Sequence, residues 1–307
     1  MRNRPRVTVL GSLNMDISVT VPRLPEPGAT VLGSAARFTP GGKGANQAVA
    51  AARLGASVRM AGCVGDDDVG RRLLAALRDE GVNADDVLVT ANAPTGLAMI
   101  SVDHAGENII TVAPGANHEV AGEQVAAATG HGDGILVICA EIPVPAITSA
   151  LTRAGRCILN RAPAPPGAAA IVAAGVDWLV VNETEAAAVL GRPVSGLAGA
   201  GQAAADLVTA GARHAVVTAG AHGAALAGPD AAATIGAFRV DAVDTVGAGD
   251  TFVGALAVAL AADIPAAEAV RAAAAAGATA ATRPGAQAGM PRPADILATT
   301  GVAWPAG

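Results

Sequence analysis

Residues 135–218 contain four short apolar runs, ILVIC (135–139), CILN (157–160), WLVV (178–181) and HAVVT (214–218). Each run has the length and the composition of a strand that is buried on both faces. Stretches with the composition of helices separate these runs, near 146–153, 183–190 and 198–210. Because strands alternate with helices, we predict an α/β fold with a doubly wound, mostly parallel sheet and helices on both faces.

The first half of the chain extends this sheet and predicts a second, smaller one. Two apolar runs, 7–10 and 58–64, indicate further strands of the large sheet. Four β-rich segments fall outside the strand–helix alternation: 17–21, 31–38, 97–102 and 108–112. We therefore expect one domain over residues 1–307, with a small β-sheet lid formed by about 16–38 and 97–112.

The composition argues against several classes of protein. The chain has 307 residues, of which 52% are hydrophobic, and a formal net charge of −6. Sequence-independent nucleic-acid binding needs a basic face, and no apolar run reaches membrane-spanning length without Gly or charged residues. Three isolated cysteines, at 63, 139 and 157, predict buried free thiols and lack metal-ligand spacing. We expect a cytoplasmic protein with no nucleic-acid or membrane partner.

A glycine-rich segment near the C-terminus, Asp244-Thr-Val-Gly-Ala-Gly-Asp-Thr-Phe-Val-Gly254, carries the strongest functional signal. Small residues at the start of a helix expected over 248–261 let free backbone N–H groups converge on an anion. Asp250 lies in the first turn, where the helix dipole favours a carboxylate. A plain capped helix explains one glycine and one acid, but not the whole segment. The segment is neither a Walker A loop nor a G-x-G-x-x-G dinucleotide fingerprint.

A second glycine-rich segment, Gly41-Gly-Lys-Gly-Ala-Asn-Gln47, leads into a helix expected over 44–54. It contains Lys43, the one lysine among 20 basic residues. Glycines let a ligand pack against the backbone, and Lys43 and Asn46 are spaced to face the same side of a helix. Both side chains bind hydroxyl groups well, so the segment predicts a polar ligand. A plain glycine turn is the alternative.

Three polar segments follow predicted strands and are ambiguous by themselves. Asn14-Met-Asp16 forms either a turn or a ligand-binding pair. Asn182-Glu-Thr-Glu185 fits a capping box at a helix start, and such a cap is compatible with a nucleotide contact. Thr218-Ala-Gly-Ala-His-Gly223 indicates a glycine turn between two strands.

Together these motifs resemble the PfkB carbohydrate kinase family, and within it the ribokinases. The resemblance runs from Gly11-Ser-Leu-Asn-Met-Asp16 to Gly285-Ala-Gln287, which is almost the whole chain. Residues 41–50 are similar to the family's N-terminal signature, and residues 244–250 to its C-terminal one. The resemblance implies ATP-dependent phosphorylation of D-ribose at the 5-hydroxymethyl group, which gives ribose 5-phosphate and ADP.

The resemblance also implies roles for individual residues. Asp250 would take the proton of the sugar hydroxyl, and the backbone of Gly247, Ala248 and Gly249 would form an anion hole. The residues that match sugar-binding positions are Asn14, Asp16, Gly42, Lys43, Asn46 and Glu141, with Asp250. Those that match the nucleotide site are Asn182, Thr218, Gly220, Gly223 and Gly249. Glu185 would help to organise Mg²⁺ indirectly.

A monovalent-cation site and a homodimer are implied as well. Two loops match the halves of a site for K⁺ or a similar ion: Asp244 and Val246, and Ala281, Pro284 and Ala286. One carboxylate with several carbonyl groups suits a large, weakly hydrated ion. Gly289 departs from the family, which often has a hydroxyl side chain there. Since two-stranded ribbons are marginal alone, we expect the lids of two copies to pair.

Other functions remain open at this point. Related kinases act on 2-deoxyribose, a nucleoside or a ketohexose. A nucleoside kinase needs an apolar wall for the base, and Phe38 is the single aromatic residue of the predicted lid. A non-catalytic sugar-binding regulator would lack Asp250 or the anion hole, and a nicotinamide dehydrogenase would carry the dinucleotide fingerprint.

Overall fold

The computed structural model describes residues 4–132, 134–161, 168–173 and 175–306, and contains a nine-stranded sheet. Its strands in spatial order are β13 (Ala232–Gly236), β12 (Gly223–Ala227), β11 (Ala212–Thr218), β10 (Val176–Asn182), β9 (Cys157–Asn160), β8 (Ile135–Cys139), β1 (Arg6–Leu10), β4 (Ser57–Gly65) and β5 (Asn83–Thr90). Pairing is parallel from β5 to β11 and antiparallel for β12 and β13. The predicted mostly parallel, doubly wound sheet is confirmed.

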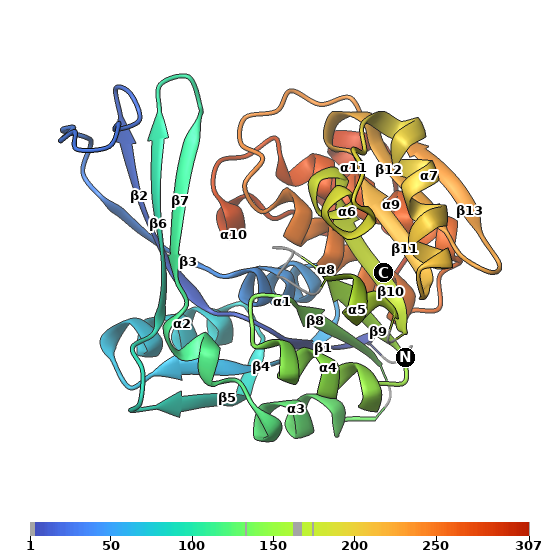
Figure 1. The fold of residues 1–307 in the computed structure, drawn as a ribbon, viewed down its shortest axis with the longest axis horizontal. Coiled ribbons are helices and arrows are strands. Elements are labelled where there is room, and N and C mark those ends of the chain that lie inside the picture. The colour runs from blue at the N-terminus through green and yellow to red at the C-terminus, as the bar shows by residue number, and fades with distance from the viewer. Residues whose placement is uncertain (1–3, 133, 162–167, 174, 307) are drawn as a thin grey trace.

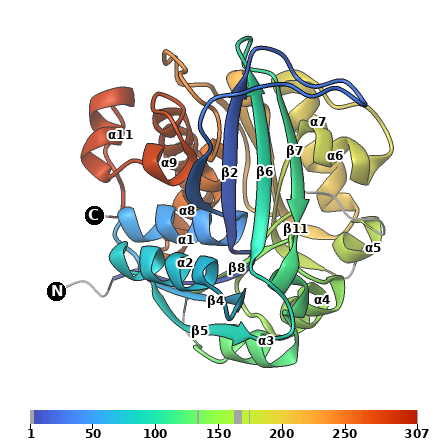
Figure 2. The ribbon, with the colours of Figure 1, turned by 90° about the vertical axis from the view of Figure 1, so that its left-hand side faces the viewer.

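Helices cover both faces of this sheet (Figure 2). One face carries α1 (Lys43–Arg53), α2 (Asp68–Asp79), α8 (Ala248–Ala261), α9 (Ala266–Ala280) and α11 (Pro293–Thr300). The other carries α3 (Gly122–Thr129), α4 (Val144–Arg153), α5 (Ala168–Ala173), α6 (Glu183–Leu190) and α7 (Gly196–Thr209). Val9 and Val137 point into the first core, and Leu10 and Ile138 into the second, as the two-residue period of a strand requires. Within the described residues, no helix is long and apolar enough to cross a membrane.

A four-stranded sheet forms a separate layer, and its strands β2, β6 and β7 lie side by side in both views (Figures 1 and 2). Its order is β3 (Arg37–Gly41), β2 (Asn14–Val21), β6 (Gly96–Asp103) and β7 (Asn108–Ala113). The prediction of a strand over 31–38 is wrong, because pairing with β2 covers only Arg37–Gly41. Gly33, Ser34 and two alanines interrupt the β-rich pattern, and Leu32 is exposed.

Several elements were not predicted from the sequence. Strand β5 reads NADDVLVT, and its polar first half obscures the apolar pattern of a strand at the sheet edge. Helix α3 and the short helix α10 (Ala286–Gly289) were also missed, as were two 3₁₀ turns, η1 (Gly115–Glu119) and η2 (Gly220–His222). The turn η2 does connect β11 to β12, so the predicted glycine turn between two strands is present.

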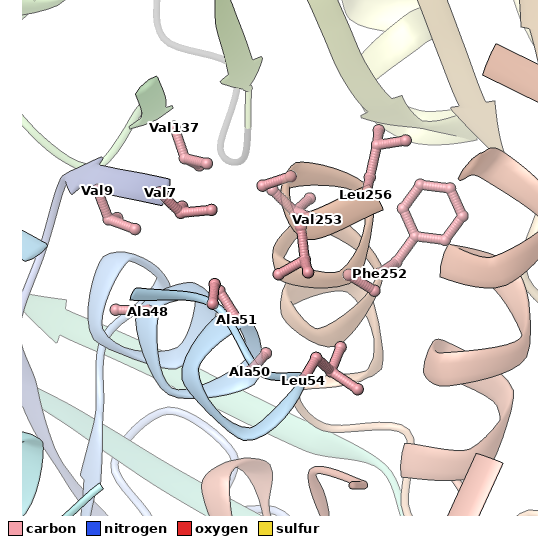
Figure 3. Packing of buried hydrophobic residues seen from close by; sticks show 14 of the residues in the cluster. Val7, Val9, Ala48, Ala50, Ala51, Leu54, Val137, Phe252, Val253 and Leu256 are labelled. Carbon is pink, nitrogen blue, oxygen red and sulfur yellow. The ribbon is translucent and has the colours of Figure 1, made fainter. Parts of the chain in front are cut away.

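Close packing of α1 against α8 holds the two glycine-rich segments together (Figure 3). Ala51 of α1 lies toward Val253 of α8, and Ala48 lies beneath Val9 of β1. At Gly254 the helices come so close that an added Cβ would lie 2.7 Å from Ala50 Cβ. Gly254 is therefore needed for the approach of the two helices.

We predict that Gly254→Ala destabilises the protein. The new Cβ would also lie 2.7 Å from the carbonyl oxygen of Gln47, and such overpacking typically lowers the free energy of unfolding by ~1–3 kcal/mol. Gly199→Ala in α7 is the matched control, because its nearest atoms lie 3.9 Å away. The control should gain about 0.5–1 kcal/mol from helix propensity. Urea denaturation measures both, and equal stability of the two variants would contradict the packing argument.

Candidate active site

Polar residues gather at the carboxyl edge of the large sheet, where the parallel strands end. Strand β9 ends at Asn160, β10 at Asn182 and β11 at Thr218, while Glu141 follows β8. A cleft of about 200 Å³ opens here. Its lining consists of Lys43, Asn160, Val180, Val181, Asn182, Glu185, Thr218, Thr245, Gly247, Gly249, Asp250 and Val253. The edge is where open α/β sheets bind ligands, and residues of both glycine-rich segments meet there.

Asp250 is fixed by two hydrogen bonds from α1. Asn46 Nδ2 donates to Asp250 Oδ2 at 2.9 Å, and Gln47 Nε2 donates to Asp250 Oδ1 at 3.1 Å. The carboxylate is only 8% exposed, and it lies in the first turn of α8 after Gly247, whose φ is 78°. Both oxygens are thus held in one orientation beside the cleft, which prepares the group to accept a proton from a bound hydroxyl.

Gln47 and Gln287 were missed in the sequence interpretation, although Gln47 belongs to the quoted motif. The Gln47 amide is fully buried and also donates to Asn160 Oδ1 at 2.9 Å. Gln287 Nε2 donates to Asn46 Oδ1 at 3.0 Å. A continuous chain of amides therefore supports Asp250 from α1, β9 and α10. Each of these contacts joins residues far apart in sequence, so local spacing gives no signal for them.

Lys43 lies among three carboxyl groups. Burial alone would lower the pKa of Lys43, but the nearby charges of Asp250 and Glu141 outweigh it and raise that pKa above its usual value. Burial, with the charges of Glu141 and Asp250, raises the pKa of Asp16 to about 7. Burial also raises the pKa of Glu141, although Lys43 opposes the shift. The site therefore combines one firmly charged cation with acids that are costly to ionise together.

Glu141 is held by residues at the start of α1 and after β1. Ser12 Oγ donates to Glu141 Oε2 at 2.6 Å, and the Lys43 backbone N–H donates to the same oxygen at 3.3 Å. Ser12 is fully buried and was not predicted. The glycines explain the close approach: a Cβ on Gly41 would overlap the Asp16 carboxylate, and Gly42 has φ 88°. Gly41 and Gly42 have no side chains, so the carboxyl groups of Asp16 and Glu141 can lie close to Lys43.

The segment after β10 forms the predicted capping box. Asn182 Oδ1 accepts from Glu185 N at 2.8 Å, and Glu185 Oε2 accepts from Asn182 N at 2.9 Å. Burial raises the pKa of Glu185, which faces the cleft. Thr218 also lines the cleft, but Gly220 and Gly223 do not. Gly220 begins η2 with φ 49°, and Gly223 follows η2 with φ 114°. Asn182 and Glu185 therefore cap α6 and also line the cleft, as expected.

The two predicted cation loops contact each other. Asp244 Oδ2 accepts from Gly285 N at 2.8 Å, and Asp244 Oδ1 accepts from Val246 N at 3.0 Å. The Ala281 carbonyl accepts two backbone N–H groups, from residues 243 and 244, at 2.8 and 3.1 Å. Gly247 packs so closely on Ala286 that an added Cβ would lie 2.8 Å from its Cα. The loops carrying Pro284 and Gly247 are thereby joined, with Asp244 as the link.

A larger cavity, about 390 Å³, lies at the opposite edge of the sheet. It is lined by residues around the amino ends of β8 and β9, including Ile135 and Arg156, and by none of the predicted site residues. The chemistry therefore belongs to the smaller cleft. Within the described part of the chain, no three His, Cys, Asp or Glu side chains cluster as a metal site. The three cysteines are buried and free, as predicted.

Comparison with known proteins identifies the family. The model of the pfkB family carbohydrate kinases matches residues 4–293. The chain belongs to the PfkB family of carbohydrate kinases. It is therefore an ATP-dependent sugar kinase, and the cleft beside Asp250 is its candidate active site.

Individual relatives agree in sequence and in fold. A ribokinase of Haemophilus influenzae is 35% identical over 301 residues, which cover 96% of this chain and 98% of the relative. The crystal structure of Thermotoga maritima ribokinase has a TM-score of 0.88 at 33% identity and covers 97% of this chain and 100% of its own. An Arabidopsis thaliana ribokinase complexed with ribose and ATP has a TM-score of 0.82 at 31% identity, and the match covers 98% of this chain and 100% of the ribokinase chain.

We predict a pH-dependent gain in stability for Asp16→Asn. Between about pH 4 and pH 7 the folded protein binds more protons at Asp16 than the unfolded chain, because folding raises this pKa from 3.8 to about 7. The contribution of Asp16 to the free energy of unfolding of the wild-type protein therefore falls as the pH rises. The variant should be more stable than wild type at pH 8 by roughly 1–4 kcal/mol, with a smaller difference at pH 5.

Urea denaturation at pH 5 and pH 8 measures this difference. Asp230→Asn, at an exposed position, is the control and should show no comparable dependence. A constant difference between Asp16→Asn and wild type at both pH values would contradict the raised pKa.

Proposed function

We propose that this kinase phosphorylates D-ribose at the 5-hydroxymethyl group and releases ribose 5-phosphate and ADP. The observation that carries the proposal is the buried Asp250 carboxylate, fixed by two amides at the amino end of α8 and facing the cleft. Such a group can accept the hydroxyl proton as the oxygen attacks the γ-phosphate. The ribokinase relatives, one of them bound to ribose and ATP, support ribose as the acceptor.

Charge on the transferring phosphoryl group is stabilised by the start of α8 in this mechanism. The N–H groups of Gly247 and Gly249 have no backbone partner within the described residues, and they are the donors we assign to the anion hole. Ala248 N–H donates to the Thr245 carbonyl at 3.2 Å, so its part requires that this bond lengthens when phosphate binds. Lys43 supplies a positive charge at the same cleft.

The sugar occupies the side of the site near the small sheet in this proposal. Asn14 and Asp16 on β2 and Glu141 after β8 bind its hydroxyl groups, together with Gly42, Lys43 and Asn46 at the start of α1. Asp16 accepts hydrogen bonds from adjacent hydroxyls. The small sheet over residues 16–38 and 97–112 acts as a lid in this proposal, although its paired strands start at Asn14 and β3 ends at Gly41.

ATP occupies the cleft beside β10 and β11 in this proposal, with Asn182, Thr218, Gly220, Gly223 and Gly249 as its contacts. Mg²⁺ accompanies the phosphates, and Glu185 orients it through water. The residues fit this ion, since Mg²⁺ in kinase sites usually keeps several waters and the Glu185 carboxylate faces the cleft. When bound, the ion neutralises charge on the transferring group. ATP dependence also fits a cytoplasmic location, which we propose.

We predict that Asp250→Asn folds and binds ribose but loses turnover. Removal of a general base typically costs ~10²–10⁴-fold in rate. Asp230→Asn, at an exposed position, should keep wild-type turnover. Coupled detection of ADP measures kcat, and thermal melting verifies the fold. A kcat near wild type in Asp250→Asn would eliminate Asp250 as the base.

Acceptor choice distinguishes ribose from the alternatives. A deoxyribokinase of Salmonella typhi is 34% identical and covers 82% of this chain, so 2-deoxyribose is the second candidate. ADP release on a panel of ribose, 2-deoxyribose, adenosine and fructose ranks the acceptors by kcat/KM. Ribose should rank first, and a higher kcat/KM for any other member would overturn the proposed acceptor.

We predict activation by a monovalent cation, with K⁺ better than Na⁺. The proposed ligands are Asp244, Val246, Ala281, Pro284 and Ala286, whose loops meet at Asp244 and Gly285. A phosphofructokinase-2 of Escherichia coli, solved in complex with potassium, has a TM-score of 0.79 at 26% identity. The ion would stiffen the turn that carries Gly247, and so preorganise the anion hole. Equal rates with KCl, NaCl and choline chloride at constant ionic strength would refute this.

We also predict a homodimer formed through the small sheet. Large apolar side chains are exposed on one face of its strands, with Phe38 at 52%, Met99 at 48% and Ile109 at 48%. A patch of this kind on a thin sheet is stabilised when a second copy covers it. Light scattering at micromolar concentration should give twice the mass of one chain, and Ile109→Lys should lower the measured mass toward that of a single chain. A fully active monomer would contradict the pairing.

A further inference from the structure

Asn117 forms three hydrogen bonds at the point where the small sheet joins the large one. It lies in η1, which follows β7, and is 1% exposed. Its Oδ1 accepts from Leu13 N at 2.9 Å, and its Nδ2 donates to Leu13 O at 3.1 Å and to Asn14 Oδ1 at 2.7 Å. The residue therefore connects η1 to the start of β2, over 100 positions earlier in the chain.

The backbone of Leu13 determines how this amide is oriented. A backbone N–H can only donate and a backbone carbonyl can only accept. Asn117 must therefore present its oxygen to Leu13 N and its nitrogen to Leu13 O. The second hydrogen of that nitrogen then points to Asn14, whose side chain must turn its own oxygen toward Asn117. Two fixed backbone groups thus set the orientation of two side-chain amides in succession.

The consequence for Asn14 is that its free end is a donor. Its oxygen is engaged by Asn117, and in the described residues its Nδ2 has no hydrogen-bond partner. Asp16 stands two residues along the same strand, on the same face, and can accept through its carboxylate. A hydroxyl group that gives its proton to Asp16 still has lone pairs that can receive the N–H of Asn14. The opposite orientation of Asn14 would present two acceptors to one hydroxyl proton.

We propose that Asn117 is a positioning residue that fixes the hydrogen-bond polarity of the sugar pocket, so that Asn14 donates where Asp16 accepts. The ligand class that needs this arrangement is a polyol with adjacent hydroxyl groups. The inference rests on the proposed function, in which Asn14 and Asp16 hold the sugar. Asn117 itself touches no substrate in this account and acts through Asn14.

Gly96 supports the arrangement from the neighbouring strand. It is the register partner of Asn14 in the β2–β6 pair. A Cβ at Gly96 would overlap both Asn14 Oδ1 and Asn117 Nδ2, whereas its backbone φ lies outside the left-handed region. The glycine is thus required for space and not for backbone conformation. Gly96→Ala therefore disturbs the same hydrogen bond from a different element.

Asn117→Asp is the direct test, because it keeps the shape and the acceptor for Leu13 N but removes both donors. Asn14 then loses its partner or turns round to donate to the new carboxylate, and the sugar loses a donor. We expect the KM for ribose to rise roughly tenfold to a hundredfold. The KM for ATP should stay within about twofold, because the nucleotide cleft is not altered. Gly96→Ala should raise the KM for ribose in the same selective way.

A double-mutant cycle with Asn14→Ala separates the possible outcomes. Asn14→Ala alone should raise the KM for ribose, and Asn117→Asp should add little in that background, because its effect passes through Asn14. If Asn14→Ala leaves this KM unchanged, the proposed sugar site is wrong and the inference falls with it. If Asn14→Ala raises it but neither Asn117→Asp nor Gly96→Ala does, the sugar site stands and the positioning role is overturned. Additive effects would likewise overturn it.

Discussion

Two amide hydrogen bonds from α1 hold the Asp250 carboxylate, and the rest of the site depends on this contact. It requires that α1 and α8 pack with almost no side chain between them, which Ala50 and Gly254 allow. Their packing in turn rests on β1 and β8, whose valines fill the core between the sheet and both helices. A buried carboxylate is costly unless its oxygens are paired, and the amides of Asn46 and Gln47 satisfy them without neutralising the charge. The Asp250 carboxylate thus keeps its ability to accept a proton.

Charge balance follows from the same arrangement. Lys43 begins the helix that holds Asp250, and it also lies near Glu141 and Asp16. Burial and the charges of neighbouring carboxyl groups raise the pKa of Asp16 and of Glu141, although Lys43 opposes both shifts. Hydroxyl groups of a neutral sugar can donate to such acids. In the proposed mechanism the anionic nucleotide instead meets the amino end of α8, where backbone N–H groups face the cleft. The proposed mechanism therefore separates the phosphate donor and the sugar acceptor by the sign of the local electrostatic field.

The sequence predicted those features that repeat along the chain. Continuous apolar runs located β8 to β11, and small residues around Gly247 located the start of α8 at the observed residue. Strand β5 was missed because paired aspartates interrupt its apolar pattern. The strand expected over 31–38 instead runs over Arg37–Gly41, because glycine and serine interrupt the earlier part of the β-rich segment. Site residues inside the glycine-rich segments were found through their composition and through family resemblance. Their roles as ligands of sugar, nucleotide and cation remain predictions.

Residues that act through long-range side-chain contacts were not predicted. Gln47 meets Asp250 across 203 positions, and Asn117 meets Leu13 across 104. Neither contact follows from local spacing, because each depends on how separate elements are brought together. Buried amides of this kind are detectable only when hydrogen-bond partners are assigned one by one.

The position of the transferred phosphate tests the central claim most directly, because the fixed Asp250 carboxylate is argued to activate a hydroxymethyl group. Proton-coupled ³¹P NMR of the product formed from ribose and ATP reports this position. Phosphorus attached through oxygen to a CH₂ group couples to two protons, so the account predicts a triplet-like signal from ribose 5-phosphate. A doublet, which indicates phosphate on a ring carbon bearing a single proton, would contradict it.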